Sequence, residues 1–352
     1  IFMNDKRLIQ QDIYYMQLAI AEAKKGIYTT RPNPAVGCVL VKDSLVIGQG
    51  YHPKAGQPHA EIFALADAKA QGFDTKGATA YVTLEPCSHT GRTPPCADAL
   101  IAANLRRVVV ASLDPNPKVA GNGIKKLQNA GIEVLVGVCD QQAAALNLGF
   151  LKAMRMGLPY VRLKTASSLD GRTAMASGES KWITGIEARE DVQRLRAQSA
   201  AIITGSGTII ADNPALTVRS KQLGVDLHML PKPKVVIVDR RNRLSDSDNY
   251  QVLNRDDTLI WRNDLMSLLK TLVSQYACYD VLIEAGSELS GAFITEGLVD
   301  ELIVYQAPCI LGQDARPMFA CQLDQLVQQY RFGLHSADII GNDIRLIYRS
   351  LT

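Results

Sequence analysis

The sequence of 352 residues has no apolar run near the ~18 residues that a membrane-spanning helix needs. Its first residues, IFMNDKR, lack the apolar core of a signal peptide, so we expect neither a membrane segment nor a secretory leader. Aromatic residues make up only 6% of the chain, and 38 basic side chains nearly balance 35 acidic ones. This balance gives no general electrostatic reason to expect a nucleic-acid partner.

The cysteines do not form the pattern of a disulfide scaffold. There are seven, an odd number, and they are scattered at Cys38, Cys87, Cys96, Cys139, Cys278, Cys309 and Cys321. Such usage is typical of a reduced, cytoplasmic protein that has a metal site or free thiols.

The domain organisation follows from length and pattern. Apolar residues make up 47% of the chain, which allows sizeable cores. Domains hold roughly 100–200 residues, so this length predicts two of them. Strand and helix patterns alternate in both halves, which favours mixed or parallel sheets covered by helices. A helical pattern over 141–156 is interrupted by Gly157 and Pro159. We therefore expect two α/β domains, at residues 1–152 and 153–352.

Two cysteines in the polar segment TLEPCSHTGRTPPCA are separated by eight residues. Cys87 directly follows a predicted strand at 78–84, and Cys96 begins a predicted helix. Upstream, the triplet HAE, which contains His59 and Glu61, begins another predicted helix. The order H-x-E and then P-C…C is that of the zinc-dependent nucleobase deaminases.

The chemistry explains these residue types. Three protein ligands leave the fourth tetrahedral position of zinc for a water molecule. Water bound there loses a proton near neutral pH and becomes a nucleophile. A nearby carboxylate that is not a ligand can carry that proton to the leaving amine. Glu61, two residues from His59, suits this task.

Less specific interpretations of these residues stay open. A lone C-x8-C or a lone H-A-E is a weak signal, and either cysteine could be an ordinary buried thiol. A purely structural zinc would need a fourth protein ligand, which His89 could supply. The residues taken together, in this order, favour a catalytic zinc site.

Three segments, RPNPAVGCVLV, GYHPKAGQPHAE and TLEPCSHTGRTPPC, resemble the deaminase domain of the bifunctional pyrimidine deaminase/reductases of riboflavin biosynthesis. In that family the wide C-x8-C spacing is the rule, whereas cytidine and tRNA adenosine deaminases have C-x2-C. The resemblance implies a cytidine-deaminase-like α/β/α domain. It implies that zinc is bound by His59, Cys87 and Cys96, and that Glu61 is the proton shuttle.

The same resemblance implies substrate contacts. It places Asn33, His52 and His89 against the pyrimidine or its ribose phosphate. Asn33 could alternatively be a turn residue, because it stands between two prolines.

The second half contains a predicted strand, a turn rich in glycine and serine at 286–291, and a helix. Backbone N–H groups and a helix N-terminus can bind a phosphate in such a turn. The signal is weak by itself, since many strand–glycine–helix turns bind nothing. It is also not the G-x-G-x-x-G of a Rossmann unit.

This turn and the segments LKTASSLDGRTAMASGESKWIT and LRAQSAAIITGSGTIIADNPALTVR resemble the reductase domain of the same family. The resemblance now covers essentially the whole chain and implies a dihydrofolate-reductase-like α/β domain that uses NADPH. The implied cofactor-binding residues are Ala166, Trp182, Thr208, Asp212, Gly286, Ser287, Glu288, Leu289, Ser290, Gly291 and Ala292. The implied substrate-binding residues are Ser180, Arg196, Leu216, Arg219 and Glu284.

Charge supports part of this assignment, because the forked donors of Arg196 and Arg219 suit the 5′-phosphate of the substrate. Alternatives remain: Trp182 could be a core aromatic residue, and Arg196 could lie on a solvated helix face. We see no strong titratable candidate for a general acid in the reduction.

The choice between NADPH and NADH depends on the segment PKVVIVDRR, in which a predicted strand ends in Asp239. An acidic residue after a strand could favour a free ribose hydroxyl, whereas an arginine would favour the 2′-phosphate. The family usually has a small polar residue where Arg240 aligns. We expect NADPH, with Arg240 near its 2′-phosphate.

The resemblance implies zinc-dependent hydrolytic deamination of 2,5-diamino-6-(5-phosphoribosylamino)pyrimidin-4-one. NADPH-dependent reduction of the ribosyl chain then gives 5-amino-6-(5-phosphoribitylamino)uracil. We expect one zinc ion per chain, a homodimer or higher homo-oligomer, and neither a nucleic acid nor a membrane as partner. A nucleic-acid deaminase would need a basic, aromatic-rich surface. A further alternative is a binding or regulatory protein, in which one or both of these sites would be inactive.

Overall fold

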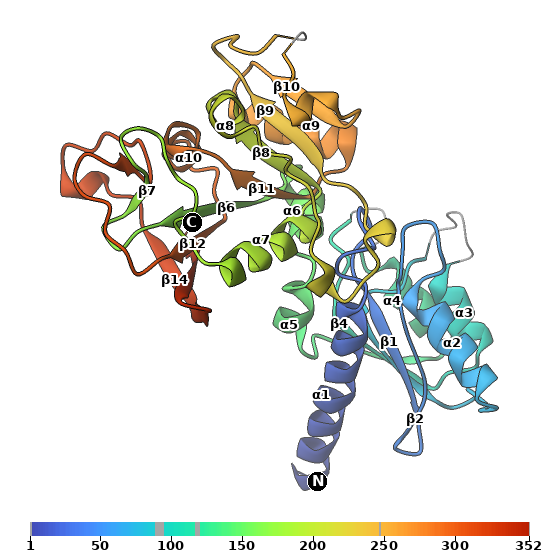
Figure 1. Cartoon of the computed structure of the whole chain (residues 1–352). Helices are drawn as coiled ribbons and strands as arrows, with labels where there is room; N and C mark the ends of the chain where they lie inside the picture. Colours follow the sequence, from blue (N-terminus) through green and yellow to red (C-terminus); the bar gives the residue numbers. More distant parts are fainter. Residues whose placement is uncertain (1, 89–94, 117–119, 246–247, 352) are drawn as a thin grey trace. The chain divides into compact units, whose positions relative to one another are not determined.

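The computed structural model describes residues 2–88, 95–116, 120–245 and 248–351, with side chains from residue 9 onward (Figure 1). The chain divides into two compact units, Ile1–Met156 and Gly157–Thr352. Gly157 has a φ of 67°, a left-handed conformation that glycine adopts without strain at the end of a helix. No helix within the described ranges is long and apolar enough to cross a membrane.

The first unit is built on a mixed sheet with the strand order β2-β1-β3-β4-β5. β1 pairs antiparallel with β2 and β3, and β4 pairs parallel with β3 and β5. Its strands are β1 (Gly37–Lys42), β2 (Leu45–Tyr51), β3 (Thr79–Leu84), β4 (Arg107–Ser112) and β5 (Glu133–Val136).

Helices cover both faces of this sheet, because alternate side chains of a strand point to opposite sides. Leu40 and Val82 pack with α2, α3 and α4, whereas Val39 and Val109 pack with α1 and α5. The helices are α1 (Phe2–Lys24), α2 (Ala60–Ala70), α3 (Cys96–Ala102), α4 (Asn122–Asn129), α5 (Asp140–Ala144) and α6 (Leu148–Met156). The expected α/β/α arrangement is confirmed.

The helix pattern predicted over 141–156 is two helices in the structure, α5 and α6, with a break between them. Asn147 lies in this break and is buried. Its side chain accepts a hydrogen bond of 2.7 Å from the Ala35 N–H and donates one of 2.9 Å to the Ala35 carbonyl. A buried amide whose donor and acceptor are both satisfied outside the helix favours the break.

Two glycines let α2 lie directly on β2. A Cβ at Gly48 would lie 2.4 Å from the Ala64 carbonyl oxygen, and one at Gly50 would lie 2.6 Å from the Ala64 nitrogen. Because both contacts are with backbone atoms, a side chain at either position would push the helix away. The packing therefore sets the position of the helix that starts directly after His59.

The second unit contains a sheet with the strand order β10-β9-β8-β11-β6-β12-β15-β14. The strands from β10 to β12 run parallel, and β15 and β14 extend the sheet antiparallel. They are β6 (Tyr160–Ser167), β8 (Ala201–Gly205), β9 (Lys234–Val238), β10 (Thr258–Trp261), β11 (Asp280–Glu284), β12 (Glu301–Gln306), β14 (Phe332–Ile340) and β15 (Asp343–Ser350). A separate small ladder joins β7 (Arg172–Ala174) to β13 (Arg316–Pro317).

In the described part of this unit, helices lie on both faces of the larger sheet. α9 (Leu265–Tyr276) and α10 (Ser287–Thr295) pack on one face, and α7 (Ile186–Gln198) and α8 (Ser206–Asp212) pack on the other. Short 3-10 turns are η1 (Lys221–Leu223), η2 (Leu227–Met229), η3 (Gln251–Asn254) and η4 (Leu326–Gln328). β8 ends at Gly205 and α8 begins at Ser206, so Thr208 lies on a helix.

Candidate active sites

Three potential metal ligands meet where α2 and α3 begin and β3 ends. The ligand atoms of His59, Cys87 and Cys96 all lie within 4.8 Å of one another. His59 Nδ1 lies 3.2 Å from Cys96 Sγ and 3.7 Å from Cys87 Sγ. Ligands about 2.0–2.3 Å from a tetrahedral zinc ion lie roughly 3.3–3.8 Å apart, so these residues fit zinc. Three such ligands, all among the described residues, would leave the fourth position of a zinc ion for water.

The two sulfurs have opposite protonation preferences. A hydrogen bond from the Cys96 thiol, with further ones from His59 and the Cys96 N–H, holds the pKa of Cys87 well below that of an ordinary thiol, against the effect of burial. The same hydrogen bond, together with burial, raises the pKa of Cys96. The pair therefore holds one proton, which would have to be released for both thiolates to bind a zinc ion.

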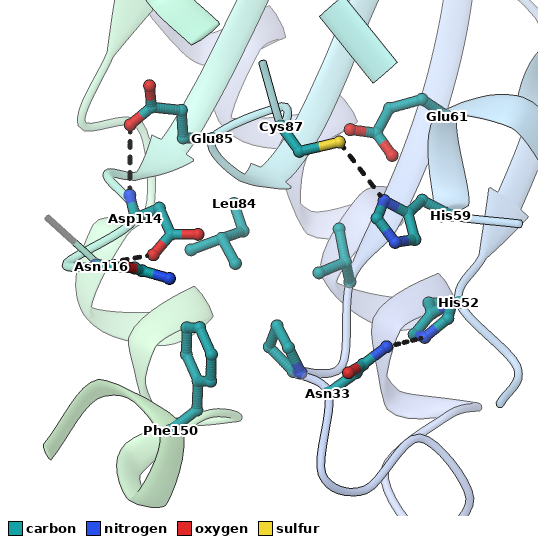
Figure 2. A pocket seen from close by; sticks show the side chains of 12 residues that line it. Asn33, His52, His59, Glu61, Leu84, Glu85, Cys87, Asp114, Asn116 and Phe150 are labelled. Carbon is teal, nitrogen blue, oxygen red and sulfur yellow. Dashed lines mark hydrogen bonds between the residues drawn. The ribbon is translucent and has the colours of Figure 1, made fainter. Parts of the chain in front are cut away.

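Glu61 lies in the first turn of α2, and Figure 2 shows its carboxyl group beside Cys87 and His59. The residue is buried, and burial is the largest cause that raises the pKa of this carboxyl group. A raised pKa lies closer to neutral pH, where a carboxyl group can both take up and release a proton. The geometry suits a proton carrier beside a metal ion bound by these residues.

A cavity of about 240 Å³ opens beside these residues. Asn33 and His52 contribute to one part of its wall, and Asp114, Asn116 and Phe150 contribute to another (Figure 2). The volume is near the lower end of ligand pockets and suits one small heterocyclic molecule.

His52 fixes the orientation of Asn33. The buried imidazole donates from Nδ1 to the Pro58 carbonyl over 3.0 Å, so its Nε2 accepts the 3.0 Å hydrogen bond from Asn33 Nδ2. Burial lowers the pKa of His52, which is consistent with a neutral ring. The Asn33 side chain thus does more than form a turn between two prolines. Its Oδ1 remains to accept a hydrogen bond from a ligand.

Sequence reasoning missed Asp114 and Asn116, which line the cavity from the loop after β4. Buried Glu85 positions this loop: its carboxylate accepts hydrogen bonds from the backbone N–H groups of Asp114, Gly121, Gly123 and Ile124, at 3.0–3.4 Å. The signal that could have pointed to these two residues is the parallel pairing of β3 and β4, because it brings the ends of both strands to the same edge of the sheet. His89 lies outside the described residues, so its role as a ligand or substrate contact stays a hypothesis.

A second polar cluster lies at the end of β11 in the other unit. Arg196 donates to Glu284 through two parallel hydrogen bonds, of 2.6 Å from Nε and 2.9 Å from Nη2. The two side chains are only 11% and 10% exposed, so the solvated-face alternative for Arg196 is wrong. Burial acts to raise the pKa of Glu284, but attraction to Arg196, Lys164 and Arg219 lowers it.

Lys164 is a further residue that sequence reasoning missed. It lies on β6 directly opposite Glu284 in the parallel pairing with β11. Burial lowers the pKa of this lysine, against the attraction of Glu284. A lysine that titrates closer to neutral pH can donate a proton more readily than an ordinary one.

The first turns of α8 and α10 lie side by side. A Cβ at Gly286 would lie 3.9 Å from Thr208 Oγ1, and one at Gly205 would lie 3.6 Å from Leu289 Cδ2. Two buried hydroxyl groups near the ends of the adjacent strands, Ser167 and Thr204, have no hydrogen-bond partner within the described chain. Glycine backbone, a hydroxyl group and the N-terminus of α10 fit the phosphates of a dinucleotide.

The remaining expected residues are more dispersed. Trp182 is 68% exposed, with the Arg189 guanidinium 4.5 Å from its ring centroid, so the core alternative is wrong. Leu216 is buried in the core against α8, and the whole residue is only 3% exposed. Ala166 is near the end of β6, Asp212 ends α8, and Ser180 is half-buried in the loop before α7.

Together these features define a class of protein. A three-layer unit with a His–Cys–Cys cluster and an adjacent buried carboxyl group is that of a zinc-dependent deaminase. It is joined here to a second α/β unit with a nucleotide-type turn.

Comparisons with known proteins agree with this class. Residues 9–112 match the cytidine and deoxycytidylate deaminase zinc-binding region, and residues 159–346 match the RibD C-terminal domain. The riboflavin biosynthesis protein RibD of Escherichia coli K12 is 47% identical, over 96% of this chain and 98% of that protein. The RibD protein of Haemophilus influenzae is 48% identical, over 96% of this chain and 97% of its own.

Solved structures give the same result. Acinetobacter baumannii RibD in form 1 has a TM-score of 0.92 at 55% identity, covering 98% of this chain and 100% of that one. The Thermotoga maritima diaminohydroxyphosphoribosylaminopyrimidine deaminase/5-amino-6-(5-phosphoribosylamino)uracil reductase has a TM-score of 0.88 at 33% identity, covering 97% and 99%. The chain belongs to the RibD family of riboflavin biosynthesis proteins, and the resemblance expected from the sequence is confirmed.

Proposed function

We propose that this chain catalyses two consecutive steps of riboflavin biosynthesis, one in each unit. The first is hydrolytic deamination of 2,5-diamino-6-(5-phosphoribosylamino)pyrimidin-4-one. The second is reduction of the ribosyl chain to give 5-amino-6-(5-phosphoribitylamino)uracil. The observation that carries the proposal is the His59, Cys87 and Cys96 cluster with Glu61 beside it, in a chain whose two halves both match their counterparts in RibD.

When bound, zinc supplies an activated water molecule to the first reaction, and NADPH supplies the hydride to the second. In the deaminase unit, His59, Cys87 and Cys96 hold the metal. Glu61 takes the proton from the attacking water and delivers it to the departing amino group. Asn33 Oδ1, held in place by His52, accepts a hydrogen bond from the substrate ring.

The loop after β4 completes this pocket. Asp114 and Asn116 line the cavity beside Phe150 and supply oxygen and amide groups that suit ribose hydroxyl groups. Phe150 supplies an apolar face for the ring. His89 would contact the pyrimidine or its ribose phosphate.

In the reductase unit, the cofactor-binding residues are Ala166, Trp182, Thr208, Asp212 and the stretch Gly286–Ala292. The substrate-binding residues are Ser180, Arg196, Leu216, Arg219 and Glu284. The adjacent first turns of α8 and α10 support the cofactor assignment. The two-point contact between Arg196 and Glu284 supports the substrate assignment, since it holds both groups rigidly.

Lys164 is the residue that we assign to the proton of the reduction. NADPH would supply a hydride to C1′ of the ribosylamino group in its imine form, and the imine nitrogen would then need a proton. Lys164 Nζ carries such a proton, and its lowered pKa makes release easier. Its position opposite Glu284 places it in the same polar cluster.

Two further observations support the assembly and location that this proposal includes. β14 is an edge strand, and its Leu334 and Ile339 are 63% and 82% exposed, which favours pairing of two copies through this unit. All seven cysteines are free, which supports a cytoplasmic location. Nucleic acids and membranes are not partners in this proposal.

The test is turnover of the purified, zinc-loaded chain on the diaminopyrimidinone substrate, with and without NADPH. Ammonia release and cofactor absorbance are followed together. We expect ammonia in both conditions and NADPH consumption only after ammonia has formed. Consumption of NADPH without any release of ammonia would contradict the proposed order.

A further inference from the structure

One face of α7 carries three long polar side chains, Arg189, Gln193 and Arg196. Residues three and four positions apart lie on the same face of a helix, so the three form one stripe. Each of them contacts a loop outside the helix. These loops contain residues that the proposed reduction uses, which gives the stripe a possible part in the reaction.

A neighbouring face of α7 attaches the helix to the sheet. Ala188 and Val192 are buried against Ile303 and Tyr305 of β12. The Tyr305 hydroxyl group also donates a hydrogen bond of 2.7 Å to the buried carboxylate of Asp191. Because these contacts hold the helix on the sheet, the polar stripe is available to hold the loops.

The Arg189 guanidinium holds the loop that joins β7 to α7. Its Nη1 donates to the Thr184 carbonyl over 2.7 Å, and its central carbon lies 4.5 Å from the centroid of the Trp182 ring. The charged hydrogen bond and the cation–π contact both favour one position of the loop. Trp182 is 68% exposed, so packing alone fixes it only weakly.

The same loop is anchored where it enters α7. The Gly185 N–H donates to Asp343 Oδ2 over 2.7 Å, and Asp343, the first residue of β15, is only 2% exposed. Gly185 has no side chain that could cap the helix, so a carboxylate from a distant strand accepts a hydrogen bond there. With this end fixed, Arg189 holds the part of the loop that contains Trp182.

Gln193 holds a second loop, which follows α8. Its Oε1 accepts a hydrogen bond of 2.9 Å from the Arg219 N–H, and Gln193 is 4% exposed. Arg196 contacts the same loop, since its Nη1 donates to the Thr217 carbonyl over 3.1 Å. Fixing the backbone of Arg219 restricts the region that its side chain can reach. The stripe therefore connects both loops to one helix.

We propose that Arg189 and Gln193 are positioning residues of the reductase unit. Arg189 fixes the loop that presents Trp182 to the cofactor and Ser180 to the substrate. Gln193 fixes the loop that presents Arg219 to the substrate. The proposal rests on the proposed NADPH-dependent reduction. Neither residue acts on a reacting atom: each reduces the entropy that its loop loses when a ligand binds.

The first measurement is NADPH oxidation by the zinc-loaded full chain with already deaminated substrate. Gln193→Met keeps the approximate length of the side chain and removes the acceptor oxygen. It should raise the KM of the substrate by roughly 3- to 10-fold, the usual effect of losing one neutral hydrogen bond. The KM of NADPH should stay within about twofold, and kcat should change little because saturating ligand restores the loop position.

Arg189→Met should behave differently, because its loop serves both ligands. It should raise the KM of NADPH and that of the substrate by about tenfold each, again with little change in kcat. Arg189→Lys keeps the charge without the planar fork and should lie between the wild type and Arg189→Met. Arg194→Met is the matched control, since Arg194 is on the same helix, is 54% exposed and pairs with Asp191.

A second measurement needs no ligand and no turnover. The chain has two tryptophans, so a Trp261→Phe background leaves Trp182 as the single indole fluorophore. Its fluorescence anisotropy should fall in Arg189→Met, recover partly in Arg189→Lys, and match the background in Gln193→Met and Arg194→Met. Arg189 is half-buried, so this measurement decides the proposal even if Gln193→Met does not fold.

Three results would overturn the proposal. They are an unchanged anisotropy in Arg189→Met, equal increases of both KM values in Gln193→Met, and a loss of kcat without any change in KM. If the wild-type chain did not oxidise NADPH, the proposed reduction itself would fail, while the anisotropy would still report whether Arg189 orders the loop.

Discussion

Arg196 and Glu284 face each other through two parallel hydrogen bonds at the end of β11, and Lys164 lies opposite Glu284 on the neighbouring strand. These three charged side chains thus form one largely buried cluster. Removing Arg196 leaves the buried Glu284 carboxylate without its hydrogen-bonded partner.

Arg196→Met should therefore destabilise the second unit. Breaking a buried pair from one side costs about 3–5 kcal/mol, although Lys164 reduces the loss by remaining near Glu284. Urea unfolding followed by intrinsic fluorescence should show the unit containing Arg196 unfolding earlier. The double variant Arg196→Met/Glu284→Leu should lose less than the sum of the single variants. Additive losses would show that the two groups do not interact.

The same pair predicts a pH dependence. The pKa of Glu284 is lowered from its usual 4.5, so the unfolded chain binds the proton more readily than the folded one. The stabilisation is complete above about pH 4.5 and is lost as the pH falls through the lowered pKa. The difference in unfolding free energy between the wild type and Glu284→Gln should be constant from neutral pH to about pH 5 and then shrink. A difference that grew on acidification would contradict the lowered pKa.

Glu61→Gln should stop ammonia release while leaving the reductase active. The amide cannot carry a proton, and loss of general acid–base catalysis typically costs 10²–10⁴-fold. Ammonia formation from the diamino substrate should fall by roughly this factor. NADPH oxidation with already deaminated substrate should stay within about twofold of the wild type, as expected for independent sites. Loss of both activities would contradict the two-site arrangement.

Cys96→Ser should abolish zinc binding, because a hydroxyl group replaces one of three protein ligands. Metal analysis of the purified chain should give one zinc ion for the wild type and a small fraction of that for the variant. Cys139→Ser is the matched control, since Cys139 is a free cysteine outside the cluster. Equal zinc content in both variants would exclude Cys96 as a ligand.

Gly123→Ala should impair the deaminase through the loop that Glu85 holds. An added Cβ would lie 2.0 Å from the Pro86 carbonyl oxygen, directly before Cys87. Overpacking of this kind costs about 1–3 kcal/mol and displaces the backbone. We expect a raised KM for the deamination substrate and an unchanged reduction step. Unchanged deamination would show that the loop relaxes without moving Asp114 and Asn116.

The zinc site could be predicted because its evidence is local and chemically restrictive. An H-A-E triplet at a helix start and a P-C…C pair after a strand leave few other interpretations. Asp114 and Asn116 could not be found in this way, since they reach the cavity only through the parallel pairing of β3 with β4.

Other differences have the same long-range origin. The break between α5 and α6 depends on Asn147, whose partner Ala35 is 112 residues away. Nothing in the local pattern over 141–156 indicates that contact. The sequence shows three arginines in one turn, Arg240, Arg241 and Arg243. Only the structure shows that their side chains contact different groups, namely Glu296, Glu288 and Ser206.

The contact between α2 and β2 affects how substitution data on this protein should be interpreted. Neither Gly48 nor Gly50 lines the cavity, yet any side chain at either position would collide with the backbone of the helix that bears Glu61. A survey of single substitutions scored by ammonia production would rank both glycines with the metal ligands. Intolerance to change therefore does not identify chemistry in this unit, and retained zinc content is the measure that separates a displaced helix from a lost ligand.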